Sequence, residues 1–184
     1  MHAPAVVWSF IPLALALPLE SRDAPEFIIT DLRATFPYPY PPYGLPSVNS
    51  LVDISVTYPD PASSIGNALN TTCSVGWPAG TDPAPTEWTP CASPSLQFRL
   101  PANGWTSTTN FTVEFWETLT SSGTGLDASH ILTSDIGNPS DPNAYLFCIQ
   151  KGKFNPLTCT LTGPMGQTQR TVVLPAVEQS SRPA

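Results

Sequence analysis

Apolar and polar residues alternate along several short segments of this sequence, and this alternation limits the folds that the chain can adopt. One face of the segment 50–58 (SLVDISVTY) carries the apolar residues Val52, Ile54, Val56 and Tyr58. The same pattern places Leu96, Phe98 and Leu100 inward in the segment 95–100, and Phe111, Val113, Phe115 and Leu119 inward in the segment 110–119. A period of two is typical of a half-buried β-strand. It also leaves Arg99, Thr112 and Glu114 on outward faces.

Turn-forming residues divide the rest of the chain into further strand candidates. These candidates are the segments 26–36, 71–77, 128–136, 144–150, 156–163 and 167–176. A chain of 184 residues with 23 prolines and few charges suits short strands joined by rigid turns better than long helices. We therefore predict an all-β fold: one compact antiparallel β-barrel or sandwich of about nine short strands.

The N-terminal segment indicates the compartment in which the protein is located. Residues 5–20 contain an apolar run of signal-peptide length, and Ala14-Leu15-Ala16 is a small-x-small cleavage pattern. We predict a signal peptide over 1–16, a short pro-segment over 17–22, a single barrel domain over 23–176 and a flexible tail over 177–184. Because no Lys or Arg precedes the apolar run, a buried N-terminal strand is the alternative. The expected location is extracellular.

The four cysteines are then expected to be paired, because a secreted chain folds in an oxidising compartment. Three connectivities are open, and the pairing of sequence neighbours, Cys73 with Cys91 and Cys148 with Cys159, is favoured. Zinc binding would need closer Cys pairs, so no metal or other cofactor is expected. The sequons at Asn70 and Asn110 are glycosylation candidates.

Two aromatic segments are candidate contact surfaces. Residues 36–46 (FPYPYPPYGLP) form a stiff loop whose aromatic members are Tyr38, Tyr40 and Tyr43. In a hairpin closed by Cys148 and Cys159, Gln150 faces Leu157, and the outer face carries an apolar stripe of Tyr145, Phe147 and Ile149. Both segments are open to two interpretations, intramolecular packing or a partner surface that includes a non-covalent homodimer.

The sequence lacks the common combinations of a nucleophile and a base that many hydrolases use. His130 is the only histidine after the apolar N-terminus, and neither a Gly-x-Ser-x-Gly elbow nor a spare cysteine accompanies it. The remaining option is a carboxylate pair for glycoside hydrolysis, formed by Glu114 with Asp53 or Asp127. A solvated Glu114 on an outward strand face is the simpler interpretation. We predict that the protein is not an enzyme.

The order of these features is similar to that of a known family. A strand with Cys73 is followed by Trp88, by Cys91 and a strand, and later by Cys148, Cys159 and the segment 170–176 (RTVVLPA). With the segment PLESR after the signal, this order resembles the Alternaria major-allergen-like family from about Phe27 to Pro175. The resemblance implies a fungal β-barrel with allergen, elicitor or effector activity and no established enzymatic role. Members that form disulfide-linked dimers have a further cysteine near the mature N-terminus, which is absent here between Leu17 and Thr72.

The expected function is therefore binding outside the cell. The partner would be a host protein or a small ligand. The first alternative is a wall-associated module that binds polysaccharide, for which Trp77, Trp88, Trp105 and Trp116 could provide stacking platforms. With 7 basic against 14 acidic residues, the surface repels phosphate backbones and anionic lipid, so neither nucleic acid nor membrane is an expected partner.

Overall fold

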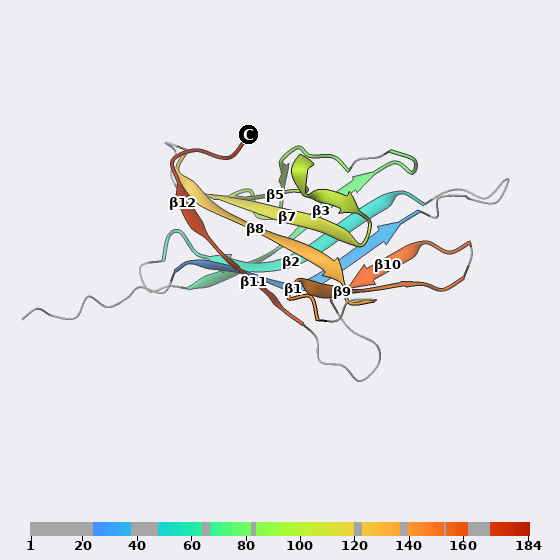
Figure 1. The fold of residues 1–184 in the computed structure, drawn as a ribbon. Coiled ribbons are helices and arrows are strands. Elements are labelled where there is room, and N and C mark those ends of the chain that lie inside the picture. The colour runs from blue at the N-terminus through green and yellow to red at the C-terminus, as the bar shows by residue number, and fades with distance from the viewer. Residues whose placement is uncertain are drawn as a thin grey trace, which may run out of the picture.

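The computed structural model describes residues 24–37, 48–63, 67–81, 84–119, 123–136, 140–152, 154–161 and 170–184, which form a nearly closed β-barrel (Figure 1). The strands are β1 (Glu26–Phe36), β2 (Ser50–Pro59), β3 (Ala68–Trp77), β4 (Thr89–Pro90), β5 (Leu96–Arg99), β6 (Trp105–Ser107), β7 (Asn110–Thr118), β8 (Gly125–Ser134), β9 (Ala144–Gln150), β10 (Leu157–Thr160), β11 (Val172–Pro175) and β12 (Val177–Gln179). The helical element in this part of the chain is a 3-10 turn, Ala102–Gly104, and no helix in it could span a membrane. The predicted signal peptide, pro-segment and Tyr38, Tyr40 and Tyr43 lie outside the described residues.

Nine strands follow one another around the wall in the order β3-β2-β1-β10-β9-β8-β7-β5-β4. Three short strands add to this path: β11 pairs with β1, β12 with β8 and β6 with β7. The prediction of an all-β barrel of about nine strands is confirmed. It is a mixed barrel, because β8 and β9 pair in parallel, at Thr133 with Ala144 and at Ser134 with Leu146.

The barrel closes between β3 and the short strand β4. The Cys73–Cys91 disulfide joins these two ends of the sheet. Next to it, the Ala92 amide donates to the Thr72 carbonyl at 2.8 Å, and the Ser93 amide donates to Thr71 Oγ1 at 2.9 Å. β4 is only two residues long, so it provides few ladder hydrogen bonds of its own. The covalent link therefore holds the sheet closed where strand pairing is weakest.

The second disulfide, Cys148–Cys159, joins β9 to β10, so both predicted pairings are confirmed. The register of this hairpin is also the predicted one, with Gln150 opposite Leu157 and Cys148 opposite Cys159. On its outer face, Tyr145, Phe147 and Ile149 are half-buried. The Tyr145 ring contacts the His130 ring edge to face, with 5.5 Å between centroids.

The core lies inside the barrel and contains the residues predicted from the alternating pattern. Val52, Ile54, Val56, Tyr58, Leu96, Phe98, Leu100, Phe111, Val113 and Phe115 are all buried, whereas Leu119 follows β7 and is partly buried. Phe115 is central, with its ring 6.0 Å from that of Phe27 and 5.5 Å from that of Phe98. Burial of such rings is the main favourable term in folding a barrel of this size.

The C-terminal residues differ from the prediction of a flexible tail over 177–184. Val177, Glu178 and Gln179 form β12, which pairs with the first residues of β8 (Figure 1). Beyond β12, the chain packs on the outer wall of the barrel through residues 182–184. Residues 177–179 are ordered because β8 offers them a free edge near Gly125. The alternating pattern of the C-terminal residues gives no indication of that edge.

Candidate functional site

A cavity of about 680 Å³ opens at the end of the barrel where β1 and β3 finish. Its described lining comes from the ends of β1 and β3, the residues that follow them, the start of β2, and β6 with the turn after it: Phe36, Pro37, Ser50, Trp77, Gly80, Thr81, Trp105, Thr106, Ser107 and Thr108. Cavities of roughly 300–1,000 Å³ with aromatic walls and a few hydroxyl groups are the common form of small-ligand sites, and barrel mouths are frequent locations for them.

Three aromatic rings, Phe36, Trp77 and Trp105, line this cavity, and the buried ring of Phe111 packs behind them. The Trp77 and Trp105 rings meet edge to face, with 5.6 Å between centroids. The centroid of the Phe36 ring lies 6.1 Å from that of Trp77 and 5.9 Å from that of Trp105. The Trp105 ring stacks on Phe111, with 5.5 Å between centroids. Trp77 is buried, whereas Trp105 is half-buried. Trp105 is therefore the ring that a bound molecule can reach.

Local geometry explains why Trp105 occupies this place. Gly104 precedes it, and a Cβ atom on Gly104 would lie 2.4 Å from the Cβ atom of Thr112. Only glycine lets the chain approach β7 this closely before β6 begins. The turn that follows is held by the Thr109 amide, which donates to Ser107 Oγ at 3.3 Å. The close approach at Gly104 and the hydrogen-bonded turn together fix the position of the Trp105 indole.

The opposite end of the barrel holds a buried acid. Glu117 continues the inward face of Phe111, Val113 and Phe115, its side chain is fully buried, and neither carboxyl oxygen has a hydrogen-bond partner among the described residues. Burial, reinforced by the negative charge of Asp60, raises the pKa of the Glu117 carboxyl to about 8. The side chain is thus protonated at neutral pH.

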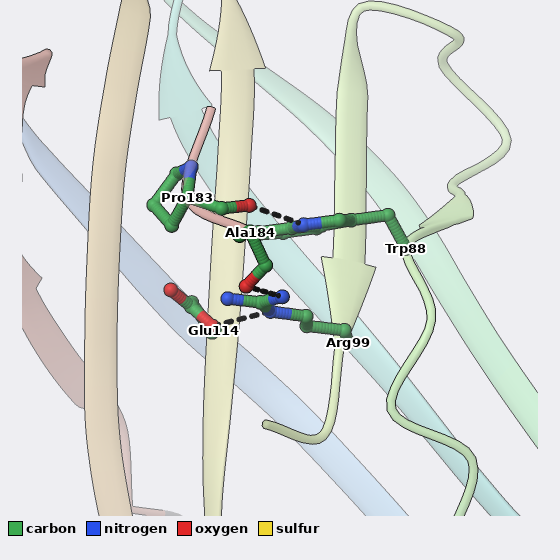
Figure 2. A network of polar contacts seen from close by, with 5 residues as sticks. All are labelled: Trp88, Arg99, Glu114, Pro183 and Ala184. Carbon is green, nitrogen blue, oxygen red and sulfur yellow. Dashed lines mark hydrogen bonds and ion pairs between the residues drawn. The ribbon is translucent and has the colours of Figure 1, made fainter. Parts of the chain in front are cut away.

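A polar network on the outer wall contains Glu114 (Figure 2). Arg99 Nε donates to Glu114 Oε2 at 2.6 Å. The expectation of a solvated Glu114 is wrong, because residues 182–184 pack over this face and the residue is only 8% exposed. Asp127 lies on the same face, and burial first and the charge of Glu114 second raise its pKa, while Arg99 opposes the shift. Asp53 is on β2, away from this group.

The remaining sequence candidates lie apart from the cavity. His130 is half-buried on β8 with its ring against that of Tyr145, and burial lowers the pKa of its imidazole. Asn70 is exposed on β3. Asn110 is half-buried, and its Oδ1 atom is buried without a hydrogen-bond partner. In the part of the chain that the structure describes, no three His, Cys, Asp or Glu side chains lie close enough to hold a metal ion.

Comparisons with protein families, curated proteins and solved structures found no match to this chain. The structure itself therefore supplies the observations on which a function can be proposed. Sequence reasoning considered Trp77 and Trp105 only as general stacking candidates and did not bring them to one cavity. It also missed Glu117, although the alternation through residue 115 extends to residue 117 and could have indicated an inward acid.

Proposed function

We propose that this protein is a secreted, non-enzymatic binding protein of the fungal allergen and effector type, which takes up a small ligand at the mouth of its barrel. The observation that carries the proposal is the aromatic cavity formed around Trp105. Two disulfides support an oxidising compartment. The resemblance in cysteine order and the predicted signal peptide supply the secreted fungal context.

The cavity favours binding over chemistry. None of its described lining residues is ionisable, so none can act as a general acid, a general base or a charged nucleophile. The polar side chains of the described lining are the hydroxyl residues Ser50, Thr81, Thr106, Ser107 and Thr108, to which the indoles of Trp77 and Trp105 add an N–H group each. Hydroxyl groups orient a ligand through hydrogen bonds, whereas indole rings supply most of the contact area.

The ligand class follows from this lining. A molecule with an apolar ring face and hydroxyl groups at its edge matches an indole beside several hydroxyls. A free sugar and a polyhydroxylated aromatic compound both have this chemistry. A strongly charged ligand is disfavoured, because the described lining offers it no counter-charge.

Titration calorimetry and tryptophan fluorescence with the intact chain test the proposal. The probes are a soluble chitin oligosaccharide, a β-glucan oligosaccharide and catechin as the aromatic compound. We expect one class to bind, Trp105→Ala to reduce its affinity at least about tenfold, and Leu69→Ala, a change at an exposed side chain of β3 outside the described cavity lining, to leave it unchanged. Binding that Trp105→Ala does not weaken would contradict the assignment of this cavity.

The wall-associated alternative differs in its ligand, which would be an insoluble polysaccharide. Retention of the protein on insoluble chitin or β-glucan, lost in Trp105→Ala, would favour a polysaccharide-binding module over uptake of a free small molecule. The hydrolase alternative depends on Glu114 and Asp127, which the structure places on one face. Cleavage of a polysaccharide that Glu114→Gln abolishes while the protein stays folded would favour that alternative.

A further inference from the structure

Ser50 is a polar residue in a row of side chains that otherwise belongs to the core. β2 directs Ser50, Val52, Ile54, Val56 and Tyr58 to the same face, and all five are buried. The four larger residues are part of the core, whereas Ser50 is 5% exposed and lines the aromatic cavity. The inward row of β2 therefore ends in a hydroxyl group at the cavity.

Aromatic residues flank Ser50 on both neighbouring strands. On one side, Ser50 is opposite Trp77 of β3. On the other side, Val52 is opposite Ala34 of β1. The next inward residue of β1 is Phe36, which therefore lies level with Ser50. Both rings line the cavity, so a molecule that reaches the Ser50 hydroxyl also contacts aromatic carbon.

The Ser50 hydroxyl differs from the other hydroxyl groups of the described lining. Thr81 and Thr106 are exposed, and Ser107 Oγ already accepts a hydrogen bond from the Thr109 amide at 3.3 Å. Ser50 is buried, and its hydroxyl makes no hydrogen bond to another described residue. Buried polar side chains ordinarily have a hydrogen-bond partner. A polar group of a molecule inside the cavity can be that partner.

The position of Ser50 is fixed by the sheet. The next residue, Leu51, is paired on both sides, with Thr35 of β1 and Gly76 of β3. A Cβ atom on Gly76 would lie 3.3 Å from the main-chain oxygen of Ser50, so β3 approaches β2 closely at this point. A hydroxyl group on such a strand is already in place before a ligand binds, which limits the entropy lost on binding.

We propose that Ser50 determines the specificity of the aromatic cavity by hydrogen bonding to a hydroxyl group on a ring of the ligand. The inference rests on the proposed uptake of a small ligand at this cavity. A ligand without that hydroxyl would leave the Ser50 hydroxyl buried and unpaired, and is disfavoured for this reason. Phenols and sugars both carry a hydroxyl group on a ring, and either class can supply it.

The test compares ligands that differ by one hydroxyl group, with the intact chain and the Trp77 indole N–H followed by NMR. The phenol pair is para-cresol and toluene. The sugar pairs are methyl β-glucoside and each of its monodeoxy analogues. We expect Ser50→Ala to lower the ratio of the two affinities at least about tenfold for a pair of one class, because the variant no longer has a buried hydroxyl to leave unpaired. The class that responds identifies the source of the hydroxyl.

Two variants show whether a change in this ratio comes from the Ser50 hydroxyl. Ser74→Ala makes the same change at an exposed residue of β3 outside the described cavity lining, and should leave the ratio as it is. Ser50→Thr keeps a hydroxyl group and should keep the preference for the hydroxylated ligand.

The failure of this inference can be distinguished from that of the proposed function. If neither para-cresol nor methyl β-glucoside moves the Trp77 signal at millimolar concentrations, ligand uptake and the role of Ser50 are both overturned. If either compound binds and Trp105→Ala weakens its binding, the cavity is the binding site. Ser50→Ala would then overturn the role of Ser50 alone by changing both affinities of every pair by the same factor.

Discussion

Arg99 and Glu114 face each other across β5 and β7 as an ion pair with 2.6 Å between Nε and Oε2, and both side chains are about nine-tenths buried. Charged residues on outward strand faces are ordinarily exposed to solvent, whereas these two are buried. The C-terminal segment covers them, and Arg99 also donates to the Ala184 main-chain oxygen. The pair thus connects the barrel wall to the segment that packs over it.

Removing one member of this pair should be costly. Arg99→Ala leaves the Glu114 carboxylate buried without its partner, and we expect it to lower the free energy of unfolding by about 3–5 kcal/mol. Chemical denaturation measures the change. The exposed ion pair of Arg33 with Asp31 is the matched control, and Arg33→Ala should cost about 1 kcal/mol or less. Equal costs for both variants would show that Arg99 is effectively solvated.

Phe115 is expected to be a major contributor to the core. Its ring is fully buried between those of Phe27 and Phe98, so Phe115→Ala should lower the free energy of unfolding by about 3–5 kcal/mol. Leu51→Ala, at a side chain that is 39% exposed, should cost far less. Denaturant midpoints of the two variants provide the measurement, and similar midpoints would contradict the described core.

Glu117 should make stability depend on pH. Its pKa is raised from 4.5 to about 8 in the folded state, so the folded chain retains a proton that the unfolded chain loses. The contribution of Glu117 to stability is therefore fully present below about pH 4.5 and falls, by at most about 1.4 kcal/mol per pH unit, until about pH 8. Glu117→Gln should remove that part of the slope and stabilise the protein near pH 8. Parallel slopes for the two proteins would contradict a buried protonated acid.

The two sequons should differ in glycan occupancy. Asn70 is exposed on β3, whereas the Asn110 side chain is half-buried with its oxygen in the interior. On expression through a secretory pathway we expect a glycan at Asn70 and none at Asn110. The mass change on enzymatic deglycosylation should disappear in Asn70→Gln and persist in Asn110→Gln. The reverse pattern would place Asn110 outside the wall.

Much of the barrel could be predicted from the sequence because the relevant constraints are local. The period of two places Phe111, Val113 and Phe115 on one face, and a disulfide between near neighbours fixes the register of Cys148 against Cys159. The outer network could not be predicted in this way. Trp88 and Pro183 are 95 positions apart, and no local pattern specifies such a contact. The aromatic cavity could not be predicted for the same reason, because Trp77 and Trp105 meet only when the barrel closes.

The position of β1 in the sheet has a consequence for how the protein is made. β1 is the first described strand, yet it pairs with β10 and β11, which come from the last part of the chain. At synthesis rates of roughly 5–20 residues per second, β1 waits on the order of ten seconds for these neighbours. During that interval only β2 can pair with it among the strands that the structure places beside it. Completion of the wall is thus a late, long-range step, of the kind that slows folding and leaves strand edges open to chaperones or to aggregation.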